Sequence, residues 1–217
     1  LTEIGSVNLD VDGNSFKLGF PENVARGDVL VTNQADVYVM GIGGGNLLIN
    51  ARDIDILNGS ILYGGIFPEM GTPETIAGDI TLNATGLIKV ADKSMIDNLV
   101  RQNSQGQGGN ITIYTDSFLL QNGAQIVAST FGKGNAGSVK ITALNVVSLA
   151  DAAILSALEA GGVGQGGDID INAASLSLQD GAQLLTSTRG ASASQPPAKG
   201  DAGNVNVKVS GEVNIAG

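Results

Sequence analysis

The fold of this chain is decided by the stretch Gly109-Asn110-Ile111-Thr112-Ile113, with Phe118-Leu119-Leu120-Gln121-Asn122-Gly123-Ala124-Gln125-Ile126 shortly after it. Apolar residues alternate with polar ones in each segment, which predicts short strands that each bury one face. Glycine and small polar residues separate the segments and predict tight corners. The same arrangement returns from Gly167 to Leu185. The chain therefore repeats one unit of three strands and three corners.

A glycine opens each unit and recurs at steps of 28 to 36 residues, at Gly45, Gly78, Gly109, Gly137, Gly167 and Gly203. A period of this length is typical of stacked repeat proteins. None of the units shows the i, i+3, i+4 spacing of an amphipathic helix. We therefore expect an all-β chain folded as a right-handed parallel β-helix, since left-handed hexapeptide coils are far more regular than these units.

The alternation also predicts which side chains point inward. In the first strand of each unit they are Leu47/Ile49, Ile80/Leu82, Ile111/Ile113, Val139/Ile141, Ile169/Ile171 and Val205/Val207. In the second strand they are Ile54/Ile56, Ile88/Val90, Phe118/Leu120, Val147/Leu149, Leu176/Leu178 and Val213/Ile215. In the third strand they are Ile61, Ile96, Ile126, Ile154 and Leu184.

A short polar residue follows every opening glycine, at Asn46, Asp79, Asn110, Ser138, Asp168 and Asn204. Stacked coils would place these side chains in one column at one corner. Polar side chains in such a column can bond to each other and to the turn backbone, as they do in cross-β stacks. We expect this ladder to be structural.

Residues 45–217 are predicted to form one continuous regular domain, and residues 1–44 an irregular N-terminal part of the same β-helix. In that part, Val29/Val31 and Val37/Val39 fit the second and third strands of an earlier coil. The chain begins in mid-pattern and its last unit lacks a third strand, so we expect an interior fragment of a longer protein.

The third corner carries loops of variable length, at residues 63–77, 97–108, 131–136, 159–166 and 189–202. Insertions on one face of a repeat protein often form its binding face. A helical turn within residues 97–107 is an alternative, because Ile96, Leu99 and Val100 have the spacing of one.

The chain has no cysteine, no histidine and a net charge of −10. These counts exclude disulfides, thiolate and imidazole metal sites, a cysteine nucleophile and a Ser-His-Asp triad. The acidic balance argues against nucleic acid and anionic membranes as partners. No apolar run reaches the roughly 18 residues that would predict a membrane span.

Two stretches could carry chemistry. Asp168 and Asp170 lie on one strand face with Lys140 one coil away, and paired carboxylates serve as acid and base in glycoside cleavage. The run from Gly161 to Asp168 weakly resembles a calcium-binding glycine repeat, but its Asp is misplaced and it does not recur. We interpret the first as solvated outer-face residues and the second as a corner. We thus predict no catalytic, cofactor-binding or metal-binding residues and leave the ligand-binding residues open.

The repeats resemble those of filamentous-haemagglutinin-type exoproteins of two-partner secretion, in particular cyanobacterial members. The resemblance rests on residues 109–113, 120–126, 129–137 and 180–185, and on the Gly134-Asn135-Ala136-Gly137 and Gly200-Asp201-Ala202-Gly203 joints. It implies export through an outer-membrane partner, by way of an N-terminal secretion domain whose Asn-Pro-Asn-Gly-type motif is absent here. It also implies a secreted or cell-surface location.

The sequence thus leads us to expect a non-catalytic structural and adhesive shaft segment. A carbohydrate-binding or polysaccharide-degrading module is one alternative, and a fibre unit that stacks end to end with other copies is another. The candidate partners are the secretion pore, a cell-surface glycan or protein, and a second copy of the chain.

Overall fold

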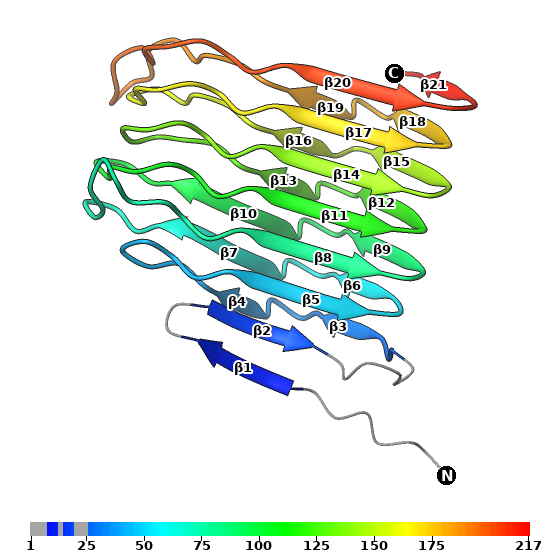
Figure 1. The fold of residues 1–217 in the computed structure, drawn as a ribbon. Helices are drawn as coiled ribbons and strands as arrows, with labels where there is room; N and C mark the ends of the chain where they lie inside the picture. The colour runs from blue at the N-terminus through cyan, green and yellow to red at the C-terminus, as the bar shows by residue number, and fades with distance from the viewer. Residues whose placement is uncertain (1–7, 13–14, 20–25) are drawn as a thin grey trace.

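The computed structural model describes residues 8–12, 15–19 and 26–217. Residues 1–7, 13–14 and 20–25, which belong to the predicted irregular N-terminal part, lie outside the described residues. Successive coils contribute their strands to three sheets (Figure 1). The predicted all-β parallel β-helix is confirmed. Among the described residues the structure contains no helix, and hence none that is long and apolar enough to cross a membrane.

The three sheets run the length of the stack. The first contains β1 (Asn8–Asp12), β2 (Ser15–Gly19), β5 (Leu47–Ala51), β8 (Ile80–Ala84), β11 (Ile111–Thr115), β14 (Val139–Ala143), β17 (Ile169–Ala173) and β20 (Val205–Val209). The second contains β3 (Val29–Val31), β6 (Ile54–Ile56), β9 (Leu87–Val90), β12 (Ser117–Gln121), β15 (Val146–Ala150), β18 (Ser175–Gln179) and β21 (Val213–Ile215). The third contains β4 (Asp36–Tyr38), β7 (Ile61–Ile66), β10 (Met95–Val100), β13 (Gln125–Val127), β16 (Ala153–Leu155) and β19 (Gln183–Leu185).

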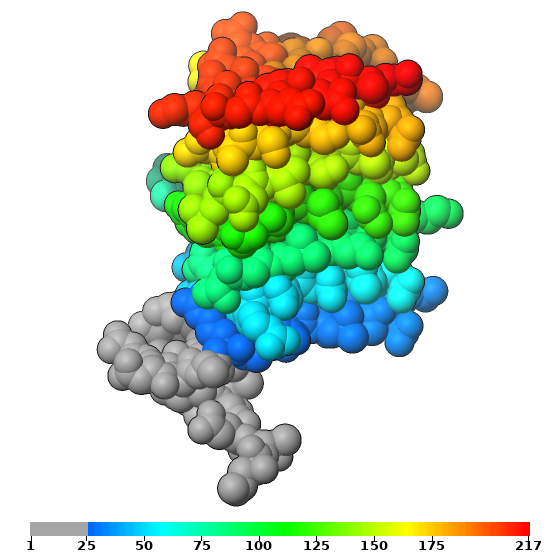
Figure 2. Space-filling view, turned by 90° about the vertical axis from the view of Figure 1, so that its right-hand side faces the viewer, coloured from blue at the N-terminus to red at the C-terminus, as the bar shows by residue number. Residues whose placement is uncertain are grey.

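Strands of successive coils pair in parallel, as β11 does with both β8 and β14. In Figure 1 the front strands run from left to right, and the chain returns behind them from right to left while it climbs towards the C-terminus. This winding is right-handed, as predicted. Figure 2 shows the coils as successive layers. The strand β1 departs from the pattern, because it pairs antiparallel with β2 at the N-terminal edge of the first sheet.

The predicted inward side chains form one continuous core. In β5, β8, β11, β14 and β17 all of them are at most 2% exposed. Those of the last coil face the end of the stack, where no further coil covers them, and Val205, Val207, Val213 and Ile215 are 42 to 72% exposed. Each coil therefore buries its apolar face only against its neighbours. The stability of the stack is then close to a sum of contributions from single coils and from contacts between adjacent coils.

One predicted inward residue is wrong. Leu62 is fully buried and pairs in register with Ile96, whereas Ile61 is half-buried. The cause is the preceding corner, where Asn58 and Gly59 have φ angles of 56° and 73°, close to those of Asn122 and Gly123. Because the two corners have the same left-handed turn, the next inward residue follows at the same distance along the chain in both. Ile61 and Leu62 are both apolar, so the alternation in the sequence could not show which of them faces inward.

The predicted polar ladder is confirmed. The backbone N–H of Asp79 donates to Asn46 Oδ1 at 2.7 Å, and each later member donates to the side-chain oxygen of the one before. The last step, from Asn204 to Asp168 Oδ1, is 2.6 Å long. These bonds satisfy backbone donors that the corner would otherwise leave unpaired, so the ladder fastens each coil to the next.

The opening glycines are required because the coils approach each other closely at this corner. A Cβ atom on Gly137 would overlap the carbonyl oxygen of Gly109, and one on Gly109 would overlap that of Gly78. Gly167 and Gly203 are in the same situation one and two coils later. The recurring glycine of the sequence is therefore a condition of the coil spacing.

The third corner is more ordered than the sequence predicts. β7 and β10 extend to Ile66 and Val100, so the loops expected from residues 63 and 97 begin later, and the helical alternative for 97–107 is wrong. Both residues are buried and form a small second core with Ala77. This burial holds the chain in the sheet beyond the point where the repeat unit appeared to end.

Candidate functional site

A row of outward side chains crosses the third corner, one from each coil. Isolated parallel bridges link Val100 to Thr130, Thr130 to Leu158, and Leu158 to Thr188. The residues after them are therefore aligned, and backbone N–H groups tie them coil to coil, as from Phe131 to the Val100 oxygen at 2.8 Å. We call the aligned set Phe67, Arg101, Phe131, Glu159 and Arg189 the third-corner row.

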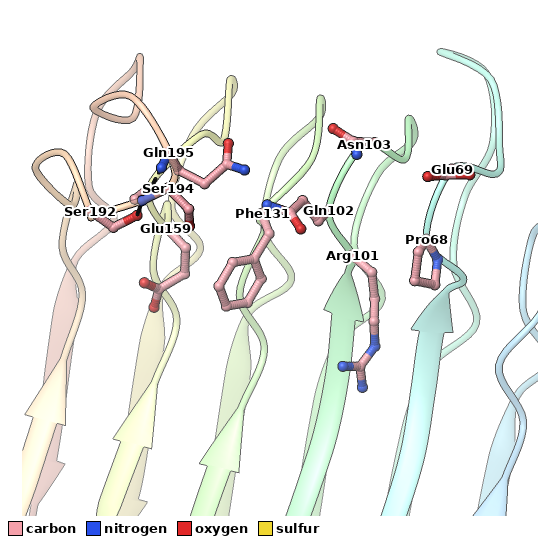
Figure 3. Close-up of a pocket in the computed structure, with 11 residues that line it drawn as sticks. Pro68, Glu69, Arg101, Gln102, Asn103, Phe131, Glu159, Ser192, Ser194 and Gln195 are labelled. Carbon is pink, nitrogen blue, oxygen red and sulfur yellow. Dashed lines mark hydrogen bonds between the residues drawn. The ribbon is translucent and has the colours of Figure 1, made fainter.

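A hollow of about 540 Å³ lies over the middle of this row. Phe131, Arg101 and Glu159 project from neighbouring coils in the same direction (Figure 3). The amides of Gln102, Asn103 and Gln195 also line the hollow, together with Pro68, Glu69 and two serines. An aromatic ring flanked by opposite charges and by amides can bind a polar ligand that also has apolar faces.

The last loop forms one wall of the hollow. The Ser192 hydroxyl accepts the backbone N–H of Gln195 at 3.0 Å, and the Ser192 N–H donates to the Gln195 oxygen at 2.9 Å. Gly161 N–H donates to the Pro196 oxygen at 2.8 Å, which ties this loop to the coil below. Gln195 is thus held above Glu159 by backbone geometry.

Arg101 is held in place by contacts with Asp97 and Tyr63. Its guanidinium binds Asp97 Oδ2 at 2.8 Å and lies 5.9 Å from the ring centroid of Tyr63. Tyr63 in turn stacks on Tyr38 with ring centroids 4.3 Å apart. The Nε atom of Arg101 and the Oδ1 atom of Asp97 are buried without a hydrogen-bond partner.

Burial raises the pKa of Asp97 from 3.8 to about 6, and Arg101 only partly opposes this shift. The side chain is 6% exposed, so removing the carboxylate from water costs more than the single ion pair returns. The pKa of Asp97 is higher in the folded state than in the unfolded chain, so the protonated carboxyl contributes to stability. This contribution is complete below pH 3.8 and is lost as the pH rises through about 6.

Asp97→Asn should remove this pH dependence. We expect the free energy of unfolding of the natural protein, relative to the variant, to fall by up to about 3 kcal/mol as the pH rises through this window. Denaturant unfolding of both proteins at several pH values measures the difference and cancels the contribution of other carboxyls. A difference that does not vary with pH would contradict the burial argument.

The carboxylates singled out by the sequence lie elsewhere, on the outer face of the first sheet. Lys140 and Asp170 are neighbours across β14 and β17 and line a shallow hollow of about 300 Å³. Asp170 Oδ1 accepts a hydrogen bond from Asn206 Nδ2 at 2.9 Å. Asp168 is a ladder member, so the structure does not bring the two carboxylates together over one site.

The glycine run from residue 161 to 167 is built into corners, as interpreted from the sequence. Gly164 has a φ angle of 157° and stacks against Gly134, where a Cβ atom would overlap the Gly134 oxygen. Asp168 Oδ1 accepts from both Asn204 N and Nδ2. Over the described part of the chain, no group of three or more acidic side chains could hold a metal ion.

Sequence reasoning pointed to the third-corner loops as a possible binding face but missed the row within them, although the row left a signal in the sequence. Each member lies five residues after the inward residue of the third strand, as Arg101 does after Ile96 and Phe131 after Ile126. The row mixes aromatic, basic and acidic residues, two Phe, two Arg and one Glu, so the sequence shows no column of similar side chains. The misassigned Ile61 also hid the spacing to Phe67.

The architecture defines the class of the protein, a parallel β-solenoid of three-strand coils. No protein-family model matches the chain, and neither a curated protein nor a solved structure matches it significantly. The resemblance to haemagglutinin-type exoproteins thus gains no support from these comparisons and stays a prediction from the repeat residues.

Proposed function

We propose that this chain is a non-catalytic shaft segment of a secreted or cell-surface adhesive protein of the haemagglutinin type. The observation that carries the proposal is the unbroken polar ladder from Asn46 to Asn204, in which every step is a backbone-to-side-chain hydrogen bond. The ladder side chains are occupied in holding the coils together. The third-corner row, whose side chains vary from coil to coil, is the irregular surface. Export through an outer-membrane partner belongs to the same proposal.

The test is incubation of the folded protein with a panel of cell-surface and plant-type polysaccharides. Retention and the release of new reducing ends are measured together. We expect retention on at least one polysaccharide without new ends. New ends would overturn the non-catalytic part of the proposal, and the absence of retention on every polysaccharide and on intact cells would overturn the adhesive part.

Polysaccharide cleavage is the alternative, and the pKa of Asp97 favours it, because a carboxyl with a pKa of about 6 is suited to general acid catalysis. Two observations weigh against it. The carboxylate is only 6% exposed, and Arg101 occupies its Oδ2 atom. A general acid must come within hydrogen-bond distance of the substrate. If Asp97→Asn abolished the release of new ends, Asp97 would be assigned that role.

End-to-end association is a further alternative, favoured by the exposed apolar side chains of the last coil. Val207 on β20 and Ile215 on β21 are 44% and 72% exposed. A second copy stacked on this end would cover them. A sedimentation coefficient that rises with protein concentration, and that no longer does so in Val207→Lys, would support end-to-end association over the shaft.

A further inference from the structure

From the third-corner row and its hollow we infer a binding site for a linear, neutral oligosaccharide that lies parallel to the solenoid axis. This inference rests on the proposed adhesive function and assigns it a place and a ligand class. The site is the hollow itself, with Phe131 as its aromatic surface and the amides of Gln102, Asn103 and Gln195 around it.

The direction of the ligand follows from the register. The row runs across the strands, one residue per coil, so neighbouring members are about 4.8 Å apart. Its five members span about 19 Å, four such steps, which is close to the length of a linear tetrasaccharide. A chain of repeating sugars laid along the row would therefore place about one sugar in each of the four steps between neighbouring coils.

The charge pattern favours a neutral ligand. Arg101 is paired with Asp97 at 2.8 Å and Arg189 with Glu159 at 3.5 Å, so both cations of the row are already compensated. Glu69 adds a further negative charge at the rim, and the whole chain carries −10. Among the described residues of the row, an acidic sugar or a phosphate would find no cation without an ion pair, and Lys133 lines a separate, adjoining hollow. The net negative charge would also repel such a ligand at long range.

The polar groups around the ring suit sugar hydroxyls. The side-chain amides of Gln102, Asn103 and Gln195 have no hydrogen-bond partner among the described residues, so each can donate and accept. The carboxylate of Glu159 can accept from further hydroxyls. Phe131 supplies a flat apolar surface between Arg101 and Glu159, which suits the C–H face of a sugar ring.

The backbone of the row argues against an extended peptide as the ligand. A peptide that binds by strand addition needs an open row of N–H and C=O groups. The N–H groups of Arg101, Phe131, Glu159 and Arg189 all donate to the coil before. The row therefore offers side chains only, and recognition has to come from rings, amides and carboxylates.

The experiment is calorimetric titration of the whole chain with cello-, manno- and malto-oligosaccharides, from disaccharide to hexasaccharide. Oligogalacturonate of matching length is the anionic comparison. We expect at least one neutral series to bind, with an affinity that rises to about the tetrasaccharide and then levels off. Binding of oligogalacturonate alone, or of no neutral oligosaccharide, would overturn the inference.

Three variants locate the site. Phe131→Ala should weaken binding by about tenfold through loss of the ring contact. Gln102→Ala, an exposed side chain whose loss leaves the fold intact, should weaken it by roughly threefold. Tyr114→Ala is the matched control, because Tyr114 is 44% exposed on β11 and outside the hollow, and it should bind as the natural protein does.

The outcomes separate the site from the function it serves. If the natural protein is retained on polysaccharides and both hollow variants are retained equally, the adhesive function stands and the site is wrong. If the protein is retained only on protein-coated surfaces, the ligand class is wrong. If it is retained nowhere, the adhesive proposal itself falls.

Discussion

Ile113→Asp is expected to unfold the coil of β11, β12 and β13 together with its neighbours. Ile113 is fully buried and pairs in register with Leu82 on one side and Ile141 on the other. Removing its side chain alone costs about 2–5 kcal/mol, and a buried, unpaired carboxylate adds several more. Because each coil is stabilised only by its neighbours, the loss should spread along the stack.

Thr112→Asp is the matched control. Thr112 lies on the outer face of the same strand, in register with Lys140, so a carboxylate there meets water and a nearby cation. We expect a change within about 0.5 kcal/mol. Amide hydrogen exchange measures both variants: Ile113→Asp should lose protection in β8, β11 and β14, and Thr112→Asp should keep it. Equal behaviour would show that the inward register is wrong.

Gly137→Ala should have the next largest effect, about 3 kcal/mol or more. The added Cβ atom would overlap the Gly109 carbonyl oxygen, which is backbone in the coil below and cannot rotate away as a side chain does. Relief requires the two coils to separate at this corner. That separation would also stretch the ladder bond from Ser138 N–H to Asn110 Oδ1, which is 2.9 Å long.

Gly190→Ala tests whether the effect depends on position. Nothing lies within 4 Å of a Cβ atom at Gly190, and its φ angle is outside the left-handed region. The free energy of unfolding should therefore stay the same or rise by up to about 1 kcal/mol, because alanine restricts the unfolded chain. Thermal unfolding of the two variants side by side gives the comparison. A destabilisation of equal size in both would refute the close-approach argument.

Most of the fold could be predicted from the sequence because its determinants are local and repeated. Ile111 and Ile113 are two residues apart, so a strand places both on one face, and the same pair recurs in every coil. A glycine followed by a short polar residue likewise marks the same corner each time. Repetition converts a weak local preference into a firm prediction, since neighbouring coils repeat the same assignment.

The sequence predicted the region of the candidate site, the third-corner loops, but could not predict which side chains meet there. The sequence directed attention to Asp168 and Asp170, which the structure uses as hydrogen-bond acceptors for the next coil. The hollow at the third corner is lined by residues of different types from loops of different lengths. The row has a constant spacing from the inward residue of the third strand, but its members and the other lining residues share no side-chain chemistry that would mark them as a site.

The sequence by itself determined the coil, its three strands, nearly all of its inward residues and its polar ladder. Only the tertiary structure decided that Leu62 rather than Ile61 faces inward, that Asp97 is buried beside Arg101, and that Phe131 lies between two charges. The physical reason is the distance along the chain over which each determinant acts. Alternation is set by residues two apart in one strand, whereas the burial of Asp97 and the third-corner row depend on how residues about one coil apart pack against each other.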